Sequence, residues 1–123
     1  MCIRDRFLPE IAQGNKRILL FNNEIMGAIQ TVPSKKDFRI FRESTDISYE
    51  ITPQEKDLSK KIGDYTHKHN IDFVGIDIIG PYLTEINVIS VGTLLSINKT
   101  NNIKIEEKLW DMIEHKYKSF KET

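Results

Sequence analysis

The apolar positions of the chain fall into short runs that predict pairs of strands. Residues 16–21 and 24–32 are apolar stretches separated by Asn22-Asn23, and asparagine tolerates the positive φ that a tight turn needs. Residues 71–79 and 83–89 are two further runs rich in β-branched side chains, with Gly80-Pro81-Tyr82 between them. The pattern therefore predicts two hairpins.

Helical periodicity predicts two helices that pack on these strands. Thr52 can cap the first helix, Pro53 suits its first position, and Glu55 stands where a capping box places an acid. We expect this helix to end near residues 69–70 and to bury Leu58, Ile62 and Tyr65. The second helix closes the chain, and its apolar positions are Ile105, Leu109, Met112, Ile113 and Phe120.

The remaining stretches read as connections. Residues 33–49 are polar and without clear period, which predicts a long loop of the kind that often carries function. Residues 98–102 form a polar connector before the last helix. The expected fold class is α+β, with an antiparallel sheet built from hairpins and two packing helices.

Composition narrows the functional classes. The 123 residues are enough for one modest domain, and 39% are apolar against 29% charged, as in soluble globular proteins. With 18 basic and 18 acidic side chains, the net charge of zero gives no electrostatic case for a nucleic-acid partner. No apolar run approaches the roughly 20 residues that cross a bilayer. Cys2 is the only cysteine, so an internal disulfide is excluded, and a cytoplasmic protein fits.

The first residues form a separate problem. Residues 1–6, Met-Cys-Ile-Arg-Asp-Arg, resemble the translation of a sequencing-library transposon end. We therefore expect residues 1–6 to be non-native and residues 7–123 to be the domain, truncated on its N-terminal side.

The second hairpin carries the candidate chemistry. With a three-residue loop centred on Pro81, Ile79 pairs with Leu83, and Asp77 lies opposite Glu85, with Asn87 on the same face. Two opposed carboxylates repel each other, so they need a compensating cation or a raised pKa. Three oxygen donors without His or Cys suit Mg²⁺ or Mn²⁺. From spacing alone, a solvent-facing sheet surface with incidental acids is equally compatible.

Several sequence strings resemble the bacterial glutathione synthetase family of ATP-grasp enzymes. They are Phe-Leu-Pro-Glu-Ile at 7–11, Gly-Asn-Lys-Arg at 14–17, Val-Gly-Ile-Asp-Ile-Ile-Gly at 74–80 and Leu-Thr-Glu-Ile-Asn-Val at 83–88. The pattern of Asp, seven residues, Glu, one residue, Asn is shared across ATP-grasp enzymes, whereas these longer strings are more particular to glutathione synthetase. The resemblance runs from about residue 7 to the last helix and implies the C-terminal half of an ATP-grasp domain.

The resemblance implies a role for the hairpin. Asp77, Glu85 and Asn87 match the residues that hold the magnesium ions bridging the ATP phosphates, which makes ATP a co-substrate. In that family the γ-phosphoryl group moves to the carboxylate of γ-glutamylcysteine, and the glycine amine attacks the acyl phosphate. The partners implied are these two small molecules, with no nucleic acid and no membrane; a homo-oligomer of the complete protein stays open.

The resemblance also implies roles outside the hairpin. Arg17 matches an arginine near the acyl phosphate, and Arg39 matches the arginine of the loop that closes over the site. Phe7 and Leu8 match the segment beside adenine, and Asn15 stands where relatives carry an aspartate near the ribose. An incidental surface position is the alternative for Arg17 and for Arg39.

Three departures from the family pattern keep other functions open. Thr31 occupies a place where relatives carry a substrate-binding arginine. The loop after Arg39 lacks the family's glycines, and only Ser90 is kept in place from the family's Ser, Pro, Thr and Gly after Asn87. The alternatives are another ATP-grasp carboxylate–amine ligase or a non-catalytic binding domain. Since the phosphate-binding lysines of relatives would precede Phe7, the chain alone is expected to be inactive and to bind Mg²⁺ weakly at best.

Overall fold

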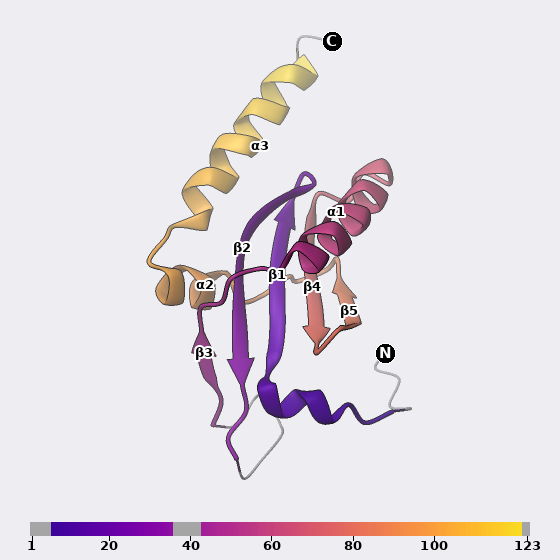
Figure 1. Ribbon diagram of the computed structural model, residues 1–123. Helices are drawn as coiled ribbons and strands as arrows, with labels where there is room; N and C mark the ends of the chain where they lie inside the picture. Colours follow the sequence, from indigo (N-terminus) through magenta and orange to yellow (C-terminus); the bar gives the residue numbers. More distant parts are fainter. Residues whose placement is uncertain (1–5, 36–42, 122–123) are drawn as a thin grey trace.

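The chain folds into a five-stranded antiparallel sheet with helices on both faces (Figure 1). The computed structural model describes residues 6–35 and 43–121. In chain order the elements are η1 (Pro9–Gln13), β1 (Asn15–Phe21), β2 (Glu24–Val32), β3 (Thr45–Ile47), α1 (Pro53–Lys68), β4 (Phe73–Ile79), β5 (Tyr82–Asn87), α2 (Leu94–Asn101) and α3 (Ile105–Lys121). The strand order is β3-β2-β1-β4-β5. The predicted α+β class and antiparallel sheet are confirmed.

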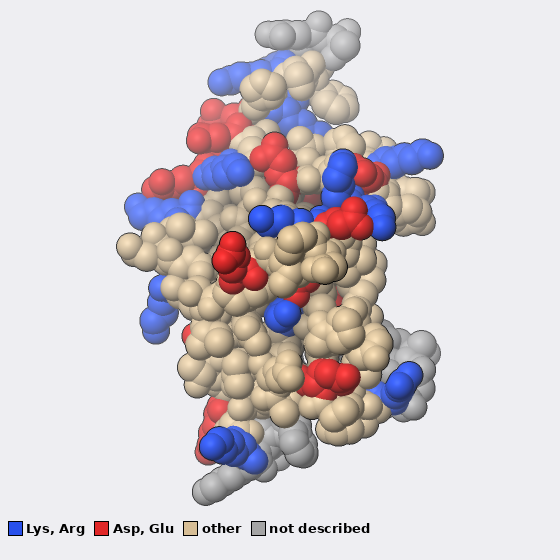
Figure 2. All heavy atoms as spheres, in the orientation of Figure 1, with Lys and Arg blue, Asp and Glu red and all other residues tan. Residues whose placement is uncertain are grey.

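The two faces of the sheet follow from the alternation of side chains along β1. Ile18 and Leu20 point to the face covered by α1, whereas Leu19 and Phe21 pack with Ile97 of α2 on the opposite face. The first half of α3 joins α2 on this second face, and its C-terminal half extends beyond the sheet (Figure 1). Figure 2 shows basic and acidic side chains interspersed over the face in view. No helix in the described residues is long and apolar enough to cross a membrane.

The first hairpin forms as predicted. Asn22 and Asn23 have φ of 48° and 67°, which are the values of the turns that match the twist of paired strands. β1 pairs with β2 from Asn15 opposite Thr31 to Phe21 opposite Glu24.

The second hairpin has a different turn from the predicted one. The prediction of a three-residue loop is wrong. Ile79 pairs with Tyr82 across a two-residue turn in which Gly80 has a φ of 56°. The register then shifts between Asp77 and Ile78, so that Thr84 has no partner in the ladder. This bulge restores the predicted pairing of Asp77 with Glu85.

The start of α1 confirms the capping box, with Thr52 and Glu55 hydrogen-bonded reciprocally. Ile62 is buried as expected, but Tyr65 is 65% exposed, which contradicts its predicted place on the buried face. The helix ends at Lys68 and His69 follows as its C-cap, close to the predicted end.

Two stretches predicted as connections contain regular structure. Residues 98–101 belong to α2, so the predicted polar connector is wrong, and the described residues contain three α-helices where two were expected. The predicted loop 33–49 contains β3, which pairs with β2; residues 36–42 of it lie outside the described residues. Helix α2 forms because Ile97 is completely buried against the sheet.

A buried ion pair joins β1 to α1 on the opposite face from the candidate site. Lys16 Nζ lies 2.6 Å from Glu55 Oε1, and the Glu55 side chain is 9% exposed. Burial raises the pKa of Glu55, but hydrogen bonds from Lys16 and from the backbone of Thr52 outweigh it, so this pKa lies below its usual value.

We expect Glu55→Gln to make stability less dependent on pH. A carboxylate with a lowered pKa stabilises the fold above its unfolded pKa, and this contribution is lost as pH falls through its folded pKa. Glutamine keeps a capping group at this position. The variant should be about 1 kcal/mol less stable than the native chain at pH 7, and the difference should shrink as pH falls through the lowered pKa of Glu55. Urea unfolding at several pH values measures this. Glu114→Gln, which removes an exposed pair with Lys118, should show almost no difference at any pH.

Candidate functional site

The candidate site lies at the end of the sheet face that α2 and α3 leave uncovered. Arg17 shares a face with Leu19, and Asp77 is its direct partner in the β1–β4 ladder. Glu85 of β5 is opposite Asp77 in turn. The side chains around this point line a pocket of about 310 Å³, formed by Asn15, Arg17, Thr31, Asp77, Ile79, Thr84, Glu85 and Thr93.

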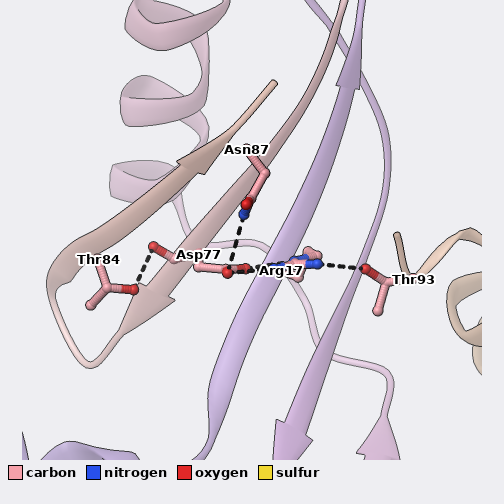
Figure 3. Close-up of polar contacts among 5 residues, drawn as sticks. All are labelled: Arg17, Asp77, Thr84, Asn87 and Thr93. Atoms are coloured by element: carbon pink, nitrogen blue, oxygen red, sulfur yellow. Dashed lines mark hydrogen bonds and ion pairs between the residues drawn. The ribbon is translucent and has the colours of Figure 1, made fainter. Parts of the chain in front are cut away.

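Arg17 and Asp77 form a bidentate ion pair (Figure 3). The Nε of Arg17 donates to Oδ1 at 2.6 Å and Nη2 donates to Oδ2 at 2.5 Å. The two side chains are 22% and 7% exposed. The hydrogen bond to Asp77 raises the pKa of Arg17, burial opposes this, and the charges of Asp77 and Glu85 add to the rise. The compensating cation that the opposed carboxylates require is therefore present within the protein.

The amide of Asn87 lies between the charged groups. Its Nδ2 is 3.5 Å from Asp77 Oδ2 (Figure 3). With its oxygen and nitrogen exchanged, the amide donates to Glu85 Oε1 and accepts from Arg17 Nη2, each at 3.2 Å. The exchanged orientation satisfies both ends of the amide. Asn87 thus joins the three other polar groups as the alternation along β5 predicted.

Two threonines complete the site, and the sequence reasoning missed both. Thr84, the unpaired residue of the bulge, donates from Oγ1 to the backbone oxygen of Asp77 at 3.2 Å. Thr93, immediately before α2, accepts from Arg17 Nη1 at 3.2 Å (Figure 3). A threonine preceding the apolar pair Leu94-Leu95 is a helix-start signal that could have identified α2.

The donor chemistry of the site fits a hard divalent cation. Asp77, Glu85 and Asn87 offer only oxygen ligands once the amide oxygen is counted. Within residues 6–35 and 43–121, no three His, Cys, Asp or Glu side chains are close enough to hold a metal, so the amide is a necessary member of the set. Arg17 binds both oxygens of Asp77, so a metal cation at this carboxylate would either share it with the guanidinium or displace the guanidinium.

Of the other predicted site residues, only some line the pocket. Asn15 lines the pocket beside Arg17. Phe7 and Leu8 precede η1 outside the pocket lining, and Phe7 is 65% exposed. Arg39 lies outside the described residues. Thr31 also lines the pocket, where its hydroxyl donates to Asp46 of β3 at 2.7 Å.

Comparisons with known proteins identify a family and relatives that this chain resembles. The model of the prokaryotic glutathione synthetase ATP-grasp domain matches residues 1–102. The glutathione synthetase of Rhodopseudomonas palustris is 38% identical over 113 residues, which cover 90% of this chain and 36% of that protein. The glutathione synthetase of Nostoc sp. is 36% identical over 110 residues, which cover 88% and 34%. The chain thus spans about a third of the length of these relatives.

A solved structure shares the fold. The ATP-grasp ligase PsnB, determined in complex with a minimal precursor, superposes with a TM-score of 0.59 at 16% identity, over 83% of this chain and 34% of that one. At this identity the likeness concerns the fold alone.

Proposed function

Because the chain belongs to the prokaryotic glutathione synthetase family through its ATP-grasp domain, we propose that it forms the wall of the active site that binds Mg²⁺ and the ATP phosphates. The single observation that supports this most is the convergence of Arg17, Asp77 and Glu85 in one pocket, with the amide of Asn87 within hydrogen-bond distance of them. The complete protein would be an ATP-dependent ligase that joins γ-glutamylcysteine to glycine in the cytoplasm.

Each side chain has a task in this proposal. Asp77, Glu85 and Asn87 would hold Mg²⁺ or Mn²⁺ through oxygen atoms, and the ion would neutralise charge during phosphoryl transfer. Arg17 presents a planar fork that can bind a carboxylate or phosphate oxygen from the same pocket. Its present partner is a carboxylate, which is the same chemistry as the proposed substrate group.

The residues that the pocket does not contain keep their proposed roles from the family resemblance. Phe7 and Leu8 would border adenine, and Arg39 would belong to the closing loop. Asn15, which does line the pocket, would hydrogen-bond the ribose.

Binding of Mn²⁺ to the 123-residue chain tests the metal proposal. The paramagnetic resonance signal of free Mn²⁺ should fall as the chain binds the ion. Glu85→Gln should weaken this binding about tenfold, which corresponds to about 1.4 kcal/mol, because one anionic ligand is lost. Glu85 is exposed and is not part of the Arg17–Asp77 pair, so its substitution should leave the unfolding midpoint unchanged. Asp77→Asn should abolish the binding.

The control for this experiment is Glu114→Gln, which removes an equally simple carboxylate from α3, remote in sequence and paired only with an exposed lysine. If Glu85→Gln binds Mn²⁺ as tightly as Glu114→Gln, the hairpin is not the metal site and the proposed function loses its main support.

A second function is favoured by one observation. Thr31 lines the pocket and its hydroxyl donates to the acid Asp46, so an acidic side chain lies next to the position where relatives have a substrate-binding arginine. A different acid substrate of another ATP-grasp carboxylate–amine ligase would explain this change. The test uses a protein extended to the full length of the relatives. Its rate of ligation with γ-glutamylcysteine and glycine is compared with its rate with other acid and amine pairs, and the faster pair distinguishes the two functions.

A further inference from the structure

Thr93 has an unusual backbone for its residue type. Its φ of 77° and ψ of −2° lie in the left-handed region, although it is β-branched. Threonine rarely adopts this region, because the branched side chain is crowded by the neighbouring backbone. A strained non-glycine residue at the edge of a candidate site points to a local contact that maintains it.

The hydroxyl of Thr93 also does not cap the helix that follows it. Thr93 is the residue before the first turn of α2, where a threonine usually accepts a hydrogen bond from a backbone N–H of that turn. No such bond is present, and the hydroxyl accepts from Arg17 Nη1 at 3.2 Å instead. Thr93 therefore has neither the backbone conformation nor the capping hydrogen bond that threonine favours here, and it makes the contact with Arg17 instead.

This contact completes the partners of the guanidinium. Nε and Nη2 of Arg17 are held by Asp77, and Nη1 is held by Thr93. Figure 3 shows Arg17 between these two residues, which approach it from opposite sides. The bond spans 76 residues of sequence and ties the segment before α2 to β1.

We infer that Thr93 is a positioning residue, which fixes the orientation of Arg17 for binding an anionic phosphate or carboxylate group. Asp77 alone leaves the outer nitrogen of Arg17 without a fixed partner. A cation at Asp77 would compete for the same carboxylate oxygens, and the bond from Thr93 then keeps the fork inside the pocket. The inference rests on the proposed function of Arg17 and adds to it a residue on a different element.

Three substitutions separate positioning from stability. Glycine at position 93 adopts the left-handed conformation freely, so Thr93→Gly should raise the unfolding midpoint while removing the hydroxyl. Thr93→Ser keeps the hydroxyl and is the matched control. Thr93→Val keeps the β-branch and removes the hydroxyl.

The direct readout is the Arg17 side chain in a ¹⁵N-arginine-labelled chain. Rotation about the Cζ–Nη1 bond averages the signals of the two Nη1 protons. This rotation should be faster in Thr93→Gly and Thr93→Val than in the native chain, and unchanged in Thr93→Ser. Equal rotation rates in the native chain and Thr93→Gly would overturn the inference.

Binding of inorganic pyrophosphate in the presence of saturating Mn²⁺ gives the functional readout. Thr93→Gly should bind it about tenfold more weakly than the native chain, despite its higher midpoint, and Thr93→Ser should stay within about twofold. If affinity and midpoint fall together in Thr93→Gly, Thr93 is merely structural and the inference fails. If the native chain binds no pyrophosphate while Thr93→Gly still frees the guanidinium, the positioning role stands and the proposed ligand of the pocket is wrong.

Discussion

Arg17→Met should lower the free energy of unfolding by about 3 kcal/mol, the low end of the range for breaking a buried ion pair. The substitution preserves side-chain length but leaves Asp77, which is 7% exposed, opposite Glu85 without its cation. The cost arises mainly from the carboxylate that remains buried without a partner. Urea unfolding of the variant and the native chain measures the difference.

A double-mutant cycle assigns this cost to the pair. Asp77→Leu combined with Arg17→Met removes both charges, so the double variant should recover most of the loss seen in Arg17→Met. Lys108→Met is the matched control, since it removes the cation of an exposed pair with Glu24 and should change stability by less than about 1 kcal/mol. Equal losses in Arg17→Met and Lys108→Met would show that the Arg17–Asp77 pair does not stabilise the site.

Gly27→Ala should destabilise the chain by about 2 kcal/mol, although alanine ordinarily favours a strand over glycine. A Cβ on Gly27 would lie 2.7 Å from Ile97 Cγ2 and 2.9 Å from Ile105 Cδ1. Both isoleucines are buried, at 0% and 3% exposed, so α2 or α3 must move to accommodate the methyl group. Thermal and urea unfolding measure the loss.

Gly92→Ala is the control, because a Cβ at Gly92 meets no heavy atom within 4 Å and its φ is not positive. It should stay within about 0.5 kcal/mol of the native chain. If both glycine substitutions are neutral, the close packing of β2 against α2 and α3 does not constrain the fold. A movement of α2 in Gly27→Ala would also displace Thr93, so Mn²⁺-dependent binding of pyrophosphate should weaken in that variant alone.

The sequence predicted those elements whose signals are local. The Asn22-Asn23 turn and the Thr52–Glu55 capping box depend on neighbouring residues, and both form as expected. Helix α2 has only a weak local signal: Thr93 precedes the apolar pair Leu94-Leu95 but is left-handed and gives no cap, and five of the helix's 8 positions are polar. It is stabilised by Ile97 packing near Gly27, a contact that local periodicity does not reveal.

Burial along the second hairpin differs between its two strands, although both are apolar in sequence. Val74, Ile76 and Ile78 of β4 are buried between neighbours and helices. Ile86 of β5 and Val88 just after it are also apolar, but they are 44% and 42% exposed. β5 is the edge strand of the sheet, and a strand's position within a sheet depends on the order of all strands.

The candidate site could be predicted only in part for a similar reason. Opposition of Asp77 and Glu85 follows from a short hairpin, so spacing was sufficient. The contact of Arg17 with Asp77 spans 60 residues and depends on the register of β1 against β4, which no local pattern gives. The family resemblance supplied Arg17, whereas Thr93 came from the structure.

The bulge at Thr84 allows the hairpin to lose one residue and still keep Asp77 opposite Glu85. Seven residues separate Asp77 from Glu85, and a three-residue loop or a two-residue turn with a bulge gives the same count. Deleting Thr84 from the present turn would place Glu85 in regular pairing with Asp77, without the extra residue. A homologue one residue shorter can therefore retain the opposed carboxylates, so a search that requires the seven-residue spacing would overlook it.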